Sequence, residues 1–425
     1  MKKLILNICL LLFVSQLFSQ TITLDDCYMA ARKNYPLIKQ YDLIEQSKGY
    51  NLATAAKGYF PQISLNARAS WQSDVTEFPD AFMVIMNQMG IDGISFPDKD
   101  QYRIVFELYQ TIWDGGMISA VQKQVKAQSE IDKQRIEVDL YTVNNQINQL
   151  YFGILLLDEQ LIQNDLFQKE LQRNYDRISS YADNGLANQS DLNKIKVEIL
   201  SRRQAATEMK NSRDAFLMML SLFIGEKLGE NAVLEKPTDS LSISEEIDRP
   251  ELKLFDAQLQ QFDSRKSGIL AKGMPNIGLF AQGAYADPGL NMFNSGFQPY
   301  FIGGISLSWN FGRLYSYRDE CDNVEVGKKS IEVQREAFLF NLNQKIVKSN
   351  SDIEKIRELI KNDDEIILLR EQIKAVSEAK VENGTMSIND FLQDIVLADL
   401  AKQNKSLHEM QLLLTLYQLK VEKGK

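Results

Sequence analysis

The residues that could do chemistry are few, and their spacing excludes the commonest kinds of site. The chain of 425 residues holds one histidine, His408, and three cysteines, Cys9, Cys27 and Cys321. The cysteines are too far apart for the usual zinc spacings, and a single histidine leaves little scope for histidine-based catalysis. We therefore expect no enzymatic activity, no metal site and no cofactor.

The charge balance and the glycine pattern exclude nucleic-acid and nucleotide binding. The chain has 48 lysines and arginines against 57 aspartates and glutamates, a net charge of −9. An acidic surface releases no counterions from DNA or RNA, so we expect no nucleic-acid partner. The segment WDGG at 113–116 lacks the spacing of a phosphate-binding loop. It predicts a strand-to-helix transition in which Asp114 caps the helix.

The first residues predict an export signal. Lys2 and Lys3 precede a nearly continuous apolar run from Leu4 to Val14, and Ser19 precedes a plausible cleavage point. We expect residues 1–19 to be removed, together with Cys9. Cys27 and Cys321 then remain in an oxidising compartment. There they could form a disulfide or stay as two free thiols, and the sequence leaves both alternatives open.

Two tracts without proline predict very long helices. All nine prolines lie outside 98–236 and 300–425, and proline breaks helix interiors. Apolar residues recur at alternating steps of three and four, which is the spacing of a coiled-coil seam. They are Val143, Ile147, Leu150, Ile154, Leu157 and Leu161 in the first tract, and Leu407, Met410, Leu414, Tyr417 and Val421 in the second. His408 is expected on a helix surface or in a seam, and the acidic run 363–365 is expected on a solvated helix face.

The proline-bearing segments read as strands. Apolar and polar residues alternate after Pro61, from Tyr102, after Pro275 and over 300–309, each over about ten residues. Alternation of this length with aromatic residues at the ends is typical of membrane β-strands, although a soluble sheet with one buried face has the same pattern.

The chain contains an internal duplication. Pro36 and Pro61 recur as Pro250 and Pro275 at one interval, and Trp113 and Gly185 recur in order as Trp309 and Gly384. Each copy reads helix, strand, loop, strand, long helix, glycine-containing turn, helix. The first copy carries extra residues between its strands, within 72–101, which predicts a loop tip free of packing constraints.

With this order established, the sequence resembles the TolC family of outer-membrane efflux proteins over essentially all of the mature chain. The segments that carry the resemblance are TITLDDCYMAARKNYPLIKQYD, FPQISL, WDGG, NGLANQSDL and the second copy ending in ENGTMSINDFLQDIVLADL. The resemblance implies a mainly α fold with a membrane β-barrel. Long coiled-coil hairpins would form a periplasmic tunnel, and four strands from each protomer of a homotrimer would close a 12-stranded barrel.

The resulting division of the chain has two repeats after the signal peptide. The first repeat spans 20–235, with a strand hairpin at about 61–113 and a helical hairpin that turns near Gly185. The second repeat spans 236–425, with a strand hairpin at about 275–311 and a turn near Gly384. Trp113, Gly116, Trp309 and Gly312 are expected at the junction between barrel and tunnel.

The resemblance also places a constriction at the tunnel tip. It assigns a constriction-lining carboxylate to Asp390, with Asp191 as its counterpart in the first repeat and Asp394 nearby. Gln393 and Met386 stand where the family has a second carboxylate and a basic latch residue. On a threefold axis Asp390 would form a ring of like charges that attracts cations. The alternative is that Asp390 is merely the N-cap of the last helix, after Ser387.

The function that follows is a passive exit duct in the outer membrane that extends into the periplasm. The resemblance implies a periplasmic adaptor and an inner-membrane transporter as partners, in an efflux or type I secretion system, with outer-membrane lipid around the barrel. The alternative is a soluble periplasmic coiled-coil scaffold or adaptor without a pore. Four amphipathic strands of bilayer length distinguish the two, because an adaptor has no use for them.

Overall fold

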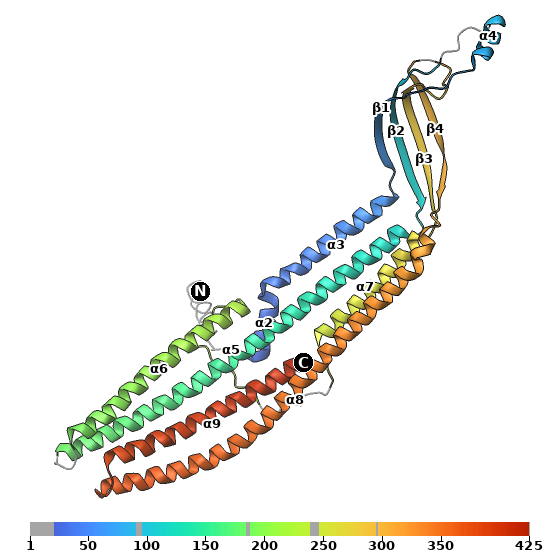
Figure 1. Cartoon of the computed structure of the whole chain (residues 1–425). Coiled ribbons are helices and arrows are strands. Elements are labelled where there is room, and N and C mark those ends of the chain that lie inside the picture. The colour runs from blue at the N-terminus through green and yellow to red at the C-terminus, as the bar shows by residue number, and fades with distance from the viewer. Residues whose placement is uncertain (1–20, 91–95, 184–187, 239–245, 295, 425) are drawn as a thin grey trace, which may run out of the picture. The chain divides into compact units, whose positions relative to one another are not determined.

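A computed structural model describes residues 21–90, 96–183, 188–238, 246–294 and 296–424. The expected signal peptide therefore lies outside the described residues. The contacts divide the chain into two compact units (Figure 1). One unit comprises 42–133 and 255–334, and we call it the strand unit. The other comprises 1–41, 134–254 and 335–425, and we call it the helical unit.

The strand unit contains one antiparallel sheet of four strands in the order β1-β2-β3-β4 (Figure 1). The strands are β1 (Gln62–Trp71), β2 (Asp100–Trp113), β3 (Asn276–Asp287) and β4 (Gln298–Ser308). The four strands expected from the alternation are thus confirmed. The loop between β1 and β2 includes a short helix, α4 (Asp80–Gln88), none of whose residues is buried. This loop carries the extra length of the first copy.

Each strand is joined in the chain to one helix, and the helices lie side by side in the same order as the strands (Figure 1). They are α3 (Gln40–Ala56), α5 (Met117–Asp183), α7 (Pro250–Lys272) and α8 (Arg313–Glu382). Within the strand unit α3 contacts α5 through the ion pair of Glu45 with Lys133. Next, Gln261 of α7 donates a hydrogen bond to Gln128 of α5 at 2.6 Å. The ion pair of Lys266 with Glu325, at 3.2 Å, then joins α7 to α8.

The two long hairpins have nearly equal dimensions, as the duplication predicts. In the first, α5 has 67 residues and α6 (Gln189–Ile224) has 36. In the second, α8 has 70 residues and α9 (Ile388–Lys423) has 36. At 1.5 Å rise per residue the longer helices are each about 100 Å long. Of the helices in the described ranges, none is long and apolar enough to cross a membrane.

The helical unit is held by two main apolar cores. One surrounds the side chains of Tyr151 and Phe152 on α5, which are essentially inaccessible to solvent. It also includes residues of α2 (Leu24–Asn34), α6 and α9. The hydroxyl of Tyr151 bonds the backbone carbonyls of Ile22 (2.8 Å) and Glu235 (2.7 Å), so this buried polar group is satisfied.

The second core lies near the hairpin turns and joins all four hairpin helices. It comprises Phe167, Leu171 and Ile178 of α5, Leu192, Ile195 and Ile199 of α6, Val381 of α8, and Phe391 and Ile395 of α9. Their spacing of three, four or seven residues places them on one face of each helix, as a coiled-coil seam requires. The two hairpins are therefore packed against each other here.

The packing decides the state of the two cysteines and the exposure of the acidic run 363–365. Cys27 is buried and Cys321 is half-buried, and both are free thiols. The acidic run 363–365 was expected on a solvated helix face, but the side chain of Asp363 is buried. Its carboxylate lies 2.6 Å from Nδ1 of His408 on α9, and this partner makes its burial tolerable.

Candidate functional site: the sheet faces and the helix tips

The sheet carries a continuous apolar face. Phe106 of β2 lies between Leu65 of β1 and Gly283 of β3, and Gly283 pairs in turn with Phe301 of β4. Leu65, Phe106 and Phe301 are 69%, 49% and 72% exposed. The same face, which we call the apolar sheet face, contains Ile63, Ala67, Ala69, Tyr102, Ile104, Leu108, Leu279, Ala281, Tyr285, Gly303, Ile305 and Leu307. An apolar surface of this extent left open to water indicates contact with lipid or with another protein.

The opposite face, which we call the polar sheet face, carries the polar side chains of the strands together with some apolar ones, such as Val105 and Phe280. Glu107 pairs with Ser64 of β1 and with Gln282 of β3, and the Gln282 amide donates a hydrogen bond to its carboxylate at 2.8 Å. Asn66, Arg68, Arg103 and Thr111 lie on this polar sheet face as well. Because one face suits lipid and the other suits water, the sheet fits the wall of a water-filled passage.

The outer strands of the sheet each pair on one side only. In the part of the chain that the structure describes, β1 pairs with β2 and β4 pairs with β3, which leaves the far edges of β1 and β4 open. Unpaired backbone groups at such edges are costly in lipid and require a further strand on each side. The sheet is therefore incomplete within one chain.

The strand-to-helix junctions use the residues that were singled out from the sequence. Asp114 caps α5, since its carboxylate accepts hydrogen bonds from the backbone N–H groups of Gly116 (2.9 Å) and Ile118 (2.5 Å). Gly116 itself has φ +88°, which favours glycine. Trp113 and Trp309 are 42% and 47% exposed.

The junction before α8 is built in a similar way. The indole N–H of Trp309 donates to the backbone carbonyl of Gly273 at 3.0 Å, and its ring lies 4.6 Å from that of Phe311. The side chain of Asn310 accepts a hydrogen bond from the Gly312 N–H at 3.1 Å. One hydrogen bond thus ties this junction to the residue that follows α7.

The two hairpin turns end in matching helix caps. Gly384 has φ +65°, which suits the left-handed residue that ends α8, whereas Gly185 lies outside the described residues. Asp191 is the third residue of α6, and its N–H donates to the Asn188 side chain at 3.0 Å. Asp390 is the third residue of α9, and its N–H donates to the Ser387 hydroxyl at 3.1 Å.

The carboxylates named from the sequence therefore all have partners within the chain. Asp390 is exposed and accepts a hydrogen bond from the Ser387 hydroxyl at 2.7 Å. Asp191 is half-buried and accepts one from the backbone N–H of Asn188 at 3.4 Å. Asp394, also half-buried, accepts one from the hydroxyl of Ser377 on α8 at 2.6 Å. The cap of α9 is Ser387 and not Asp390.

Sequence reasoning missed a charged contact between the hairpins near their turns. Nη1 of Arg177 on α5 lies 2.6 Å from Glu378 and 3.1 Å from Glu382, both on α8. Its guanidinium also lies over the Phe391 ring of α9, at 5.7 Å. The only signal in the sequence is that Arg177 lies shortly before Gly185, whereas Glu378 and Glu382, of opposite charge, lie shortly before Gly384. Met386, which stands where the resembled family has a basic latch residue, packs against the second apolar core.

Comparison with known proteins identifies the fold. Residues 27–226 match the family model of the outer membrane efflux protein. No sequence among the curated proteins matches. The solved structure of CusC, whose report describes transmembrane channel formation, superposes with a TM-score of 0.68 at 14% identity, covering 94% of this chain and 92% of that one.

Two further solved structures agree. The Campylobacter jejuni CmeC outer membrane channel gives a TM-score of 0.62 at 15% identity, over 94% of this chain and 85% of that one. The Vibrio cholerae outer membrane protein VceC gives 0.64 at 13% identity, over 94% of each chain. At such identities the likenesses establish the fold, and they extend over both repeats.

Proposed function

Because residues 27–226 carry the outer membrane efflux protein domain and the whole described chain folds like solved outer-membrane channels, we propose that this protein is an outer-membrane exit duct. It lies in the outer membrane and extends into the periplasm. Transport through it is passive, with no catalytic step, and serves a tripartite efflux or type I secretion system.

The observation that carries this proposal is the apolar sheet face. A row such as Leu65, Phe106 and Phe301 is exposed on one chain and would be stabilised by lipid. In the rival function, a soluble periplasmic scaffold or adaptor, the apolar sheet face would be exposed to water, and that function gives no reason for an apolar surface there. The duct is therefore the better account of the sheet.

The open edges of the sheet support a homotrimer. Three copies of a four-stranded sheet would pair β1 of one protomer with β4 of the next and close a barrel of 12 strands, which removes every edge. The repeats 20–235 and 236–425 would then alternate around the axis. A periplasmic adaptor and an inner-membrane transporter are the proposed partners, and they supply the energy.

Membrane fractionation followed by gel electrophoresis without heating tests this proposal. The duct predicts a trimer in the outer-membrane fraction and stable conductance steps when the purified trimer is added to a planar bilayer. A monomer in the soluble periplasmic fraction would contradict the proposal and favour the scaffold.

We also retain Asp390 as the proposed lining of the periplasmic constriction, with Asp191 and Asp394 as a second tier and the turns at Gly185 and Gly384 as the tips. Support comes from the exposure of Asp390 and its place in the first turn of α9, directly after the hairpin turn. On a threefold axis three such carboxylates concentrate cations in a narrow passage.

A further inference from the structure

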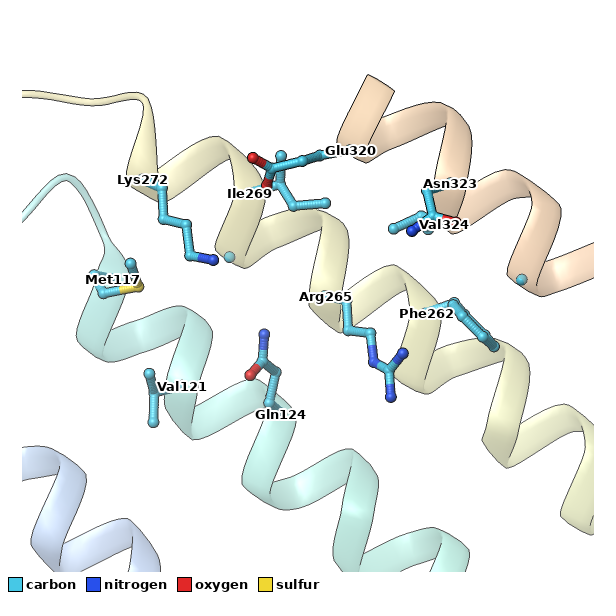
Figure 2. Close-up of a pocket in the computed structure, with 12 residues that line it drawn as sticks. Met117, Val121, Gln124, Phe262, Arg265, Ile269, Lys272, Glu320, Asn323 and Val324 are labelled. Carbon is cyan, nitrogen blue, oxygen red and sulfur yellow. The ribbon is translucent and has the colours of Figure 1, made fainter. Parts of the chain in front are cut away.

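A pocket of about 520 Å³ lies among α5, α7 and α8 in the strand unit (Figure 2). Its lining includes Met117, the first residue of α5, and Lys272, the last residue of α7. Trp113 ends the strand before α5, and Asn276 begins the strand after α7. The pocket therefore begins where the sheet stops.

Two cationic side chains enter this pocket without a carboxylate partner. Arg265 and Lys272 lie two turns apart on α7, about 10 Å along the helix, and both point toward the space between α7 and α5 (Figure 2). No acidic side chain of the described residues lies within ion-pair distance of either. By contrast, Lys266 one residue away pairs with Glu325. The acid of the pocket, Glu320, instead accepts a hydrogen bond from Ser316 at 2.8 Å.

A third donor lies between the two cations. Gln124 of α5 projects toward α7 between Lys272 and Arg265 (Figure 2). A Cβ atom at Gly268 would lie 2.9 Å from the Gln124 amide nitrogen, so glycine at this position gives the amide its room. The guanidinium of Arg265 lies over the Phe262 ring at 5.0 Å. This contact restrains the guanidinium but leaves its N–H groups available to donate hydrogen bonds. The three groups together form a row suited to an anionic oxygen group.

The rest of the lining is largely apolar. Val121, Ile269 and Val324 contribute side chains from three different helices. A pocket that combines phosphate-binding donors with aliphatic walls suits an amphiphile better than a free ion.

We propose that this pocket binds the headgroup of an anionic phospholipid from the inner leaflet of the outer membrane. The proposal rests on the proposed function, which places the strand ends at that leaflet. The phosphate lies against Lys272, Gln124 and Arg265, and an acyl chain lies along the aliphatic lining. Basic pockets between helices at a membrane surface recognise anionic lipids by this chemistry.

The test compares lipid binding by the purified trimer and its variants in an uncharged detergent. Native mass spectrometry counts bound phosphatidylglycerol and, as a neutral probe, phosphatidylcholine. We expect the wild type to retain phosphatidylglycerol in preference to phosphatidylcholine. Arg265→Gln and Lys272→Gln should each weaken phosphatidylglycerol binding about fivefold, the loss of one cation near an anionic lipid.

Lys123→Gln is the matched control, because Lys123 is an exposed lysine of α5 beside Gln124 that does not line the pocket. It should leave binding unchanged. Equal phosphatidylglycerol binding by the wild type and the Arg265→Gln/Lys272→Gln variant would overturn the proposal. Binding of inorganic phosphate as tight as that of the lipid would overturn it as well and would indicate a free-anion site. Failure of the proposed function appears separately, as absence of the wild-type trimer from the outer membrane.

Discussion

Arg202 of α6 and Asp399 of α9 form an ion pair across the two hairpins, with Nη1 3.3 Å from Oδ2. Asp399 is only 6% exposed, and its carboxylate also accepts a hydrogen bond from Gln403 at 2.6 Å. The guanidinium of Arg202 stacks on the Phe167 ring of α5 at 4.6 Å. One buried charge pair therefore joins α5, α6 and α9 between the two apolar cores.

This pair makes the stability of the helical unit depend on pH. Burial raises the pKa of Asp399 to about 6 from 3.8, although Arg202 opposes the shift. A carboxyl whose pKa is higher in the folded than in the unfolded state binds more protons when folded between pH 4 and 6. Stability from this group is thus greatest below about pH 4 and falls as the pH rises through 6.

Asp399→Asn should remove this dependence while keeping the shape of the side chain. We expect the melting temperature of the wild type to fall, relative to the variant, between pH 5 and pH 7.5. Over this pH range the loss of stability corresponds to about 1.4 kcal/mol, since about one of the two pKa units lies above pH 5. Thermal unfolding followed by circular dichroism at several pH values measures it, and parallel curves for the two proteins would contradict the role of Asp399.

Phe106→Arg should block assembly in the membrane. Its side chain lies on the apolar sheet face, and an arginine there costs about 2 to 4 kcal/mol at the bilayer midplane. Glu107→Arg, on the polar sheet face, should assemble normally. Unheated gel electrophoresis of outer-membrane fractions quantifies the trimer, and equal amounts for both variants would refute this assignment of the faces.

Asp390→Ala should reduce block by divalent or trivalent cations from the periplasmic side without preventing trimer formation. The ring loses its charge, and the helix loses one cap interaction worth about 1 kcal/mol or less. Ser387→Ala is the matched control, since it removes the capping hydroxyl but keeps the carboxylate. Single-channel recordings with and without the cations decide the point. If both variants are blocked as strongly as the wild type, Asp390 acts in helix capping alone.

Arg177→Ala should loosen the contact between the hairpins at their tips. The side chain is partly exposed, so the loss of its bonds to Glu378 and Glu382 is expected to cost about 1 to 2 kcal/mol. Conductance should rise and become less dependent on salt. Arg173→Ala, one turn earlier on α5 and exposed, should leave conductance unchanged; a similar rise in both variants would show that Arg177 does not hold the tips.

Much of the fold was predictable because its signals are local. Proline-free tracts with seam spacing predict α5 and α8, and alternation after Pro61 and Pro275 predicts β1 and β3. The turn at Gly384 follows from the conformational freedom of glycine. Each of these signals needs only residues a few positions apart, and the duplication repeats them in order.

The polar contacts could not be predicted in the same way, because each joins residues that are far apart in the sequence. Asp363 reads as part of a solvated acidic run, yet α9 places His408 against it and buries it. Sequence by itself determined the elements and their lengths, since these depend on neighbouring residues. Only the packing of one hairpin against the other decided which charges are paired, buried or left open to a ligand, because that depends on which side chains meet across the helices.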